Sequence, residues 1–175
     1  MSKNLSLFKA TTDDAKEILK LLKSHKWSKY LKQRTFNHIY ANIKDFIIVR
    51  IKGILVWNIE LINIDNETIE LGAFAISKDL DYDIKNKVWE ILIMFALQSS
   101  VIKGKKLISL TNNSKLQSWY LKYWLIESDV SDFSERKNQS PGVSLFIYSK
   151  SPISHTYSSI PLNWSHIWLA SHADR

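Results

Sequence analysis

The chain has 175 residues, enough for one domain with a normal core, and its 45 % hydrophobic and 23 % charged residues are typical of a folded globular protein. It contains no cysteine, which excludes disulfides, thiolate zinc sites and a cysteine nucleophile. Its net charge of +7 would suit a nucleic acid or an anionic small ligand. The lysines are scattered without a basic block and no nucleic-acid motif is present, so we do not expect nucleic-acid binding.

The first 45 residues predict one strand and two helices. Residues 5–10, L-S-L-F-K-A, alternate as a strand does. Thr11 or Thr12 is a suitable N-cap for a following helix, whose apolar face includes Ile18 and Leu22. Thr35 is a suitable cap for a second helix that carries Ile39.

Three β-rich runs come next, at residues 46–51, 54–64 and 68–76. They are separated by the turn-forming pairs Lys52-Gly53 and Asp65-Asn66, which predict an antiparallel meander.

The second half predicts a helix over 83–100, a strand over 105–111, a helix capped by Asn113 or Ser114, and a last strand over 143–148. The order is β-α-α-β-β-β-α-β-α-β, which indicates an α/β protein with a mixed sheet. After Lys150 the composition changes, so we expect one domain over 1–150 and a Ser-, His- and Trp-rich tail over 151–175, either packed on the domain or partly disordered.

The N-terminal residues lack the apolar core of a signal peptide, and no apolar run is long enough to span a bilayer. We therefore expect a cytoplasmic protein without a membrane partner.

The segment L-D-Y-D-I-K-N-K-V-W-E-I-L-I lies between a predicted strand and a predicted helix, where phosphate-binding elements are found. Lys85 and Lys87 would add positive charge to the helix start, and Asn86 tolerates a left-handed backbone better than most residues. No glycine is present in this segment. Taken alone, these residues fit a plain solvated turn better, because a pair of lysines at a helix start is common.

Two further residues could carry chemistry. Asn113 follows a predicted strand at its carboxyl end, where α/β sheets tend to bind ligands. Tyr120 lies in the next helix, and a tyrosine can protonate a leaving thiolate, although packing with Trp119 and Tyr123 is the simpler alternative. The five histidines have no metal-ligand spacing, and the sequence has no G-x-S-x-G, P-loop or dinucleotide-binding motif, so we expect no metal.

In its strand order and these motifs, the chain resembles the GNAT acyl-CoA N-acyltransferases over roughly residues 5–148. E-L-G-A-F-A-I is similar to the family's strand before the cofactor loop, and the asparagine and Y-L-K-Y-W-L are similar to the family's later motifs. Within the superfamily, L-K-Q-R, D-F-I-I-V-R-I-K-G, S-L-T-N-N and S-E-R-K are most similar to the acetyltransferase domain of N-acetylglutamate synthases.

The resemblance implies an acetyl-CoA-dependent N-acetyltransferase of a small amine such as glutamate, with a role in arginine biosynthesis and a possible homodimer. Its pantetheine arm would lie against the Phe74, Ala75 and Ile76 backbone, in an opening between the fourth and fifth strands. The remaining roles also follow from the resemblance: the pyrophosphate would lie on a turn over 83–88 that includes Lys85, Asn86 and Lys87, Asn113 would contact coenzyme A, Tyr120 would be the general acid, and Arg34 would pair with an acceptor carboxylate.

The sequence departs from the family at the cofactor loop, where Tyr82, Ile84 and Asn86 stand near the usual glycines. Trp124-Leu125 replaces a Gly-Phe pair, and the Arg-x-Ser pattern of the last strand is not found. The alternative is therefore a non-catalytic GNAT-fold module that binds a partner protein, partly through its Trp-rich tail.

Overall fold

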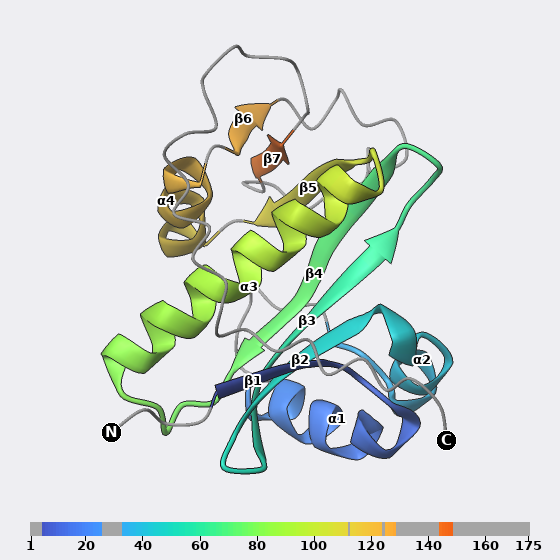
Figure 1. Cartoon of the computed structure of the whole chain (residues 1–175), viewed down its shortest axis with the longest axis vertical. Helices are drawn as coiled ribbons and strands as arrows, with labels where there is room; N and C mark the ends of the chain where they lie inside the picture. The colour runs from blue at the N-terminus through green and yellow to red at the C-terminus, as the bar shows by residue number, and fades with distance from the viewer. Residues whose placement is uncertain (1–4, 26–32, 112, 124, 129–143, 149–175) are drawn as a thin grey trace.

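A computed structural model describes residues 5–25, 33–111, 113–123, 125–128 and 144–148, which form a seven-stranded mixed sheet with helices on both faces (Figure 1). The strand order in space is β1-β2-β3-β4-β5-β7-β6. Among the described strands, only β4 and β5 pair in parallel, and the other neighbouring strands are antiparallel. The strands are β1 (Leu5–Lys9), β2 (Phe46–Ile51), β3 (Ile54–Asn63), β4 (Thr68–Ile76), β5 (Lys106–Thr111), β6 (Ile126–Ser128) and β7 (Ser144–Tyr148).

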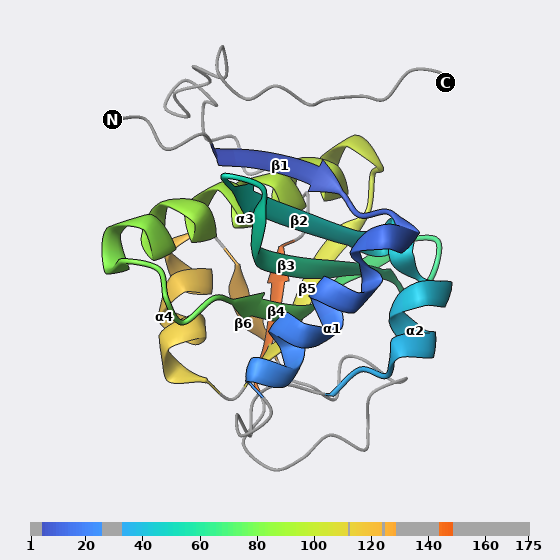
Figure 2. The same ribbon diagram turned by 90° about the horizontal axis from the view of Figure 1, so that it is seen from below.

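The helices divide between the two faces of the sheet, and Figure 2 shows α1 and α3 on opposite sides of the central strands. One core packs α1 (Ala15–Ser24) and α2 (Phe36–Ala41) against the sheet, and the other packs α3 (Tyr82–Ile102) and α4 (Ser114–Lys122). Strand alternation feeds both cores, since Ile48 of β2 faces α1 while its neighbour Val49 faces α3.

Local sequence explains most element boundaries. Thr11 forms a capping box with Asp14, and a short 3-10 turn, η1 (Thr12–Asp14), precedes α1. The Thr35 hydroxyl caps α2 by accepting from the His38 amide. Lys52 and Gly53 both have positive φ, 51° and 81°, as a two-residue hairpin turn requires. A second 3-10 turn, η2 (Ile43–Asp45), leads into β2.

The predicted element order is confirmed, with one strand missed and one helix start misplaced. The missed strand, β6, has only three residues and is too short to give an alternating pattern. The misplaced start is that of α3, which begins at Tyr82. The predicted tail over 151–175 and the first residue of the predicted last strand, Val143, lie outside the described residues.

Among the described residues, no helix is both long and apolar enough to cross a bilayer.

Candidate functional site

β4 and β5 separate about a third of the way along β4. Their parallel ladder has only three pairs and ends at Glu70 opposite Ile108, while β4 continues to Ile76. On its other edge β4 stays paired with β3 up to Ile76. The second half of β4 therefore has one backbone edge that the β5 ladder does not cover.

A β-bulge marks the point of separation. Glu60 of β3 pairs with Gly72 and Asn58 pairs with Ala75, so the single residue between them faces two residues of β4, Ala73 and Phe74. Ala73 has a φ of 42°, which is unusual for a residue with a side chain. The buried Asn58 amide donates to the Ala73 carbonyl oxygen at 2.6 Å and so holds the bulge.

The bulge determines which β4 groups face the uncovered edge. Before it, the Glu67 carbonyl accepts from the Lys106 amide on the β5 side. After it, Ala75 pairs with β3 and the Ser77 amide donates to Val56 of β3. Because successive residues of a strand point to opposite edges, Phe74 and Ile76 present their N–H and C=O groups to the uncovered edge and Ala75 does not.

One of these groups already has a partner. The imidazole Nε2 of His25, at the end of α1, lies 2.6 Å from the Ile76 carbonyl oxygen and can donate to it. This contact connects α1 to the end of the uncovered β4 edge.

Tyr120 of α4 is fully buried beside the point where the strands separate. The Ser109 hydroxyl of β5 donates to the Tyr120 oxygen at 2.8 Å and lies 3.4 Å from the Leu71 carbonyl oxygen of β4. Burial raises the pKa of Tyr120 to about 12, although the Ser109 bond opposes the rise. The phenol therefore keeps its proton at neutral pH, and this proton is not used in the bond from Ser109.

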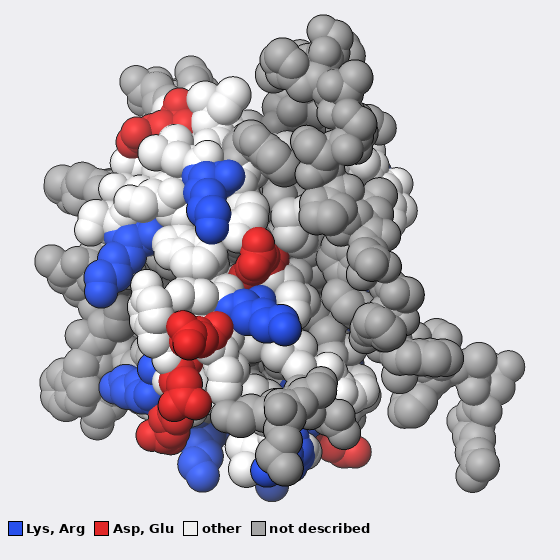
Figure 3. All heavy atoms as spheres, turned by 60° about the vertical axis from the view of Figure 1, so that its left-hand side comes forward, with Lys and Arg blue, Asp and Glu red and all other residues white. Residues whose placement is uncertain are grey.

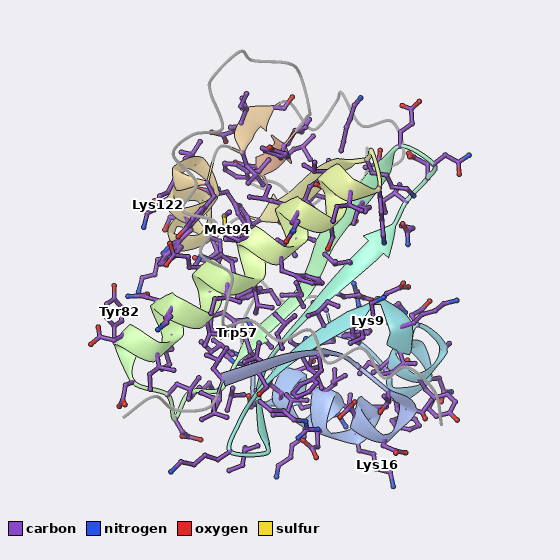
Figure 4. The ribbon with its side chains drawn as sticks, viewed as in Figure 1. Lys9, Lys16, Trp57, Tyr82, Met94 and Lys122 are labelled. Carbon is purple, nitrogen blue, oxygen red and sulfur yellow. The ribbon has the colours of Figure 1, made fainter. Side chains whose placement is uncertain are left out.

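Aromatic rings fill the space between this part of the sheet and the helices α3 and α4. Trp89 of α3 stacks on Trp57, and its ring centroid is 3.9 Å from that of Phe74. It also contacts Trp119 and Tyr120 of α4. Figure 4 shows Trp57 on the side of the sheet that α3 covers. The indole nitrogens of Trp57 and Trp89 are buried donors that have no hydrogen-bond acceptor among the described residues.

The predicted phosphate-binding turn is helical instead. Lys85, Asn86 and Lys87 lie in the first two turns of α3, and the Lys85 amide donates to Asp81 as in any helix. The expectation of a turn over 83–88 with a glycine-like Asn86 is therefore wrong; a helix start at Tyr82 leaves the first-turn amides of residues 82–84 without intrahelical acceptors.

The charges at this helix start are mixed. The Lys85 ammonium donates to the Lys78 carbonyl, while Asp83 lies in the first turn of α3 and is exposed. Figure 3 shows acidic and basic side chains intermingled on this side of the molecule. Asn113 caps α4 just after β5 by accepting from the Lys115 amide, so it stands at the carboxyl end of a strand as the sequence indicates.

Arg34 lies on the opposite face of the sheet from Tyr120. Its Nε and Nη2 each lie 2.8 Å from one carboxylate oxygen of the buried Glu60. The other Glu60 oxygen lies 2.6 Å from His38 Nε2. A Cβ at Gly72 would lie 3.5 Å from Arg34 Nη2 and 3.8 Å from Glu60, so the cluster lies directly over β4 at the bulge.

Three solved structures that share this fold were crystallised with coenzyme A. N-acetylglutamate synthase from Neisseria gonorrhoeae, with coenzyme A and N-acetyl-glutamate, has a TM-score of 0.66 and 15 % identity over 84 % of this chain. Rv2747 from Mycobacterium tuberculosis, with CoA and NLQ, has a TM-score of 0.68 and 15 % identity over 82 % of this chain and 98 % of its own. The PaiA N-acetyltransferase from Thermoplasma acidophilum, with coenzyme A, has a TM-score of 0.66 and 16 % identity over 83 % of this chain and 99 % of its own.

The chain has the GNAT fold. It spans 35 % of the length of the gonococcal synthase. No protein-family model and no curated protein matches the sequence.

Within this GNAT fold, sequence reasoning missed four polar residues: Asn58, Glu60, Ser109 and His38. One pattern could have found the first two. Asn58 and Glu60 are two residues apart in a run of apolar residues, W-N-I-E-L-I, so both point to one face of a buried strand. A carboxylate there requires a partner. Nothing local indicates that Arg34 and His38 supply it, because the three residues meet only in the folded chain.

Proposed function

We propose that the chain is an acetyl-CoA-dependent N-acetyltransferase acting on a small amine. The observation that carries the proposal is the uncovered edge of β4, with Tyr120 buried at the point where β4 leaves β5. The bulge turns Phe74 and Ile76 toward this edge, where an extended amide-containing chain such as pantetheine has hydrogen-bond partners.

Around the start of α3, some groups favour binding of the anionic pyrophosphate of coenzyme A and one opposes it. The first-turn amides of α3 and the positive end of its dipole favour a pyrophosphate, with Lys85, Asn86 and Lys87 in the next turn. Asp83 opposes it. Asn113 stands at the end of β5, and the unpartnered indole nitrogens of Trp57 and Trp89 offer two further donors nearby.

Acetyl-CoA supplies the activated acyl group, and Tyr120 supplies a proton to the departing thiolate. Its hydroxyl remains protonated at neutral pH because burial raises its pKa to about 12. Ser109 holds the phenol oxygen in place from β5.

For the acceptor, we propose an amino acid such as glutamate, processed in the cytoplasm and feeding arginine biosynthesis. Glu60 engages Arg34 through Nε and Nη2, which leaves Nη1 for an acceptor carboxylate. The gonococcal synthase, which shares the fold, was solved with N-acetyl-glutamate.

Two measurements on the purified protein test this function. Calorimetry with acetyl-CoA comes first, and no heat of binding at millimolar ligand would contradict the proposal. Release of free thiol is then followed with L-glutamate, L-glutamine, L-2,4-diaminobutyrate and spermidine as acceptors, and at least one amine should increase it over the rate without acceptor.

Tyr120→Phe tests the role of the phenol. We expect kcat at pH 7 to fall by about 10²-fold, as for loss of a general acid, with an almost unchanged Kd for acetyl-CoA. The matched control is Tyr123→Phe, one turn away in the same aromatic cluster, which should leave kcat nearly unchanged. Equal losses in both variants would assign Tyr120 to packing alone.

A non-catalytic GNAT-fold binding module is the second candidate, and the glycine-free helix start with Asp83 in its first turn favours it. It predicts that acetyl-CoA fails to bind while the protein stays folded, so the same calorimetry separates the two functions.

A further inference from the structure

Glu60 is a buried carboxylate with two basic partners of different kinds. Its side chain is 2 % exposed, and Arg34, 10 % exposed, covers one oxygen. The other oxygen meets His38, whose side chain is 39 % exposed. The cluster therefore leads from the buried β3 to the surface of α2 through one imidazole ring.

The chemistry of the pair fixes the tautomer of His38. A carboxylate beside a guanidinium is an acceptor, so the 2.6 Å contact requires that His38 Nε2 carry a proton. In the neutral ring the lone pair then lies on Nδ1. The structure describes no partner for Nδ1, and the ring is open to solvent on one side.

The cluster lies directly across β4 from the proposed general acid. A Cβ at Gly72 would lie 3.5 Å from Arg34 and 3.8 Å from Glu60, on the α2 face. The preceding residue, Leu71, has its carbonyl oxygen 3.4 Å from the Ser109 hydroxyl, which is hydrogen-bonded to Tyr120. One strand, at the point where it leaves β5, thus separates a proton donor from a group able to accept a proton.

We propose that the His38–Glu60 pair is the proton acceptor of the acetyl transfer, with His38 Nδ1 taking a proton from the acceptor's ammonium group. Glu60 is a positioning residue that fixes the tautomer and stabilises the imidazolium, and Arg34 holds the Glu60 side chain in place through its other oxygen. This inference rests on the proposed N-acetyltransferase function.

The protons balance as follows. One passes from R–NH3⁺ to His38 Nδ1 and then to solvent, which leaves an amine with a lone pair for the carbonyl carbon of the thioester. As the C–N bond forms and the C–S bond breaks, the nitrogen loses a second proton and the thiolate takes one from the Tyr120 hydroxyl. The second nitrogen proton restores the phenol, so the net products are the amide, the thiol and one proton.

Among the described residues, His38 contacts the Glu60 carboxylate, which also pairs with Arg34. Asp45 in η2 interacts electrostatically with the same Glu60. Burial raises the pKa of Asp45, and Glu60 adds to the rise. Glu60 is therefore the residue through which the rest of the cluster reaches the imidazole ring.

His38→Gln is the test, with the amine that turns over fastest in the four-acceptor panel. We expect kcat/KM at pH 7 to fall by about 10²-fold. The deficit should shrink as the pH approaches the pKa of the amine, because the acceptor then no longer requires a base. Asn37→Gln is the control: it changes the adjacent, exposed residue of the same helix and should leave the pH profile unchanged.

Two further readouts separate catalysis from structure. Glu60→Gln, checked for folding by thermal unfolding, should change the pH profile of kcat/KM, because the imidazolium loses its anionic partner. In the wild type without substrates, ¹⁵N NMR of the neutral histidine ring should show Nε2 protonated and Nδ1 unprotonated.

The outcomes distinguish this inference from the function beneath it. If the wild type acetylates no amine in the panel, both the proposed function and the proton-acceptor role of His38 are contradicted. If the wild type is active and His38→Gln keeps its rate and pH profile, the role of His38 as proton acceptor is wrong and the proposed function stands. A protonated Nδ1 in the neutral ring would contradict the same role.

Discussion

At the residue scale, the burial of Tyr120 links stability to alkaline pH. Its pKa is about 12 in the folded protein and about 10 in the unfolded chain. Between these values the folded state retains a proton that the unfolded state has lost, so stability should fall as the pH rises from 10 to 12, by at most about 3 kcal/mol from this group. Urea unfolding at pH 8 to 11.5 should show a shallower fall in Tyr120→Phe. Tyr123, whose pKa burial also raises to about 12, leaves a residual slope in that variant, and equal slopes in both proteins would contradict the assignment.

A second residue-scale prediction concerns Gly72, whose place in β4 is crowded on the Arg34 side. An added Cβ would lie 2.9 Å from Ile62 Cδ1 and 3.5 Å from Arg34 Nη2. Gly72→Ala should therefore destabilise the fold by about 1–3 kcal/mol. Ile62→Val removes the atom that clashes. The double variant should therefore lose less stability than the sum of the losses in the two single variants. Additive costs in urea unfolding would show that the clash is not the cause.

At the element scale, one hydrogen bond shapes the β4 edge that the proposed function uses. Asn58→Ala removes the donor to the Ala73 carbonyl inside the core, which should cost about 1–3 kcal/mol and raise the Kd for acetyl-CoA as the bulge relaxes. Asn63→Ala is the control: Asn63 ends the same strand and only accepts from Lys105 at the surface, so we expect less than about 0.5 kcal/mol and an unchanged Kd. A stable Asn58→Ala protein with wild-type affinity would show that the bulge does not position the ligand.

The start of α3 gives a prediction with opposite effects on stability and binding. The negative charge of Asp83 stabilises the helix, because it lies at the positive end of the helix dipole, but it repels an anion that binds there. Asp83→Asn should destabilise the protein by less than about 1 kcal/mol and strengthen acetyl-CoA binding a few-fold in calorimetry. Asp13→Asn, in the first turn of η1, controls for the general loss of one negative charge. Weaker binding in Asp83→Asn would place the nucleotide away from α3.

At the scale of the whole molecule, the sequence predicts what local chemistry decides. Helix caps and turns depend on single residues: Thr11 and Thr35 act through their side chains, and the Lys52-Gly53 pair through its backbone freedom. The order of the strands along the chain follows from the alternating pattern. The bulge is different, because Ala73 adopts a left-handed backbone through a bond from Asn58, fifteen residues earlier in the chain. The same is true of the cluster around Glu60, whose partners come from before α2 and within it. Tyr120 was predictable as a residue, but its bond to Ser109 required the packed sheet.

The net charge of +7 is a property of the whole chain, and its effect on binding can be separated from local contacts. The lysines are dispersed, so they act on an anionic ligand as a diffuse positive field that salt screens, over about 10 Å at 0.1 M and about 3 Å at 1 M. Calorimetry across this range should show acetyl-CoA binding weakening by at least about threefold. S-acetyl-pantetheine lacks the phosphates but has the same thioester arm, so its weaker binding should be nearly independent of salt. If both ligands respond equally to salt, the charge of the chain does not attract the nucleotide, and affinity depends on the β4 edge alone.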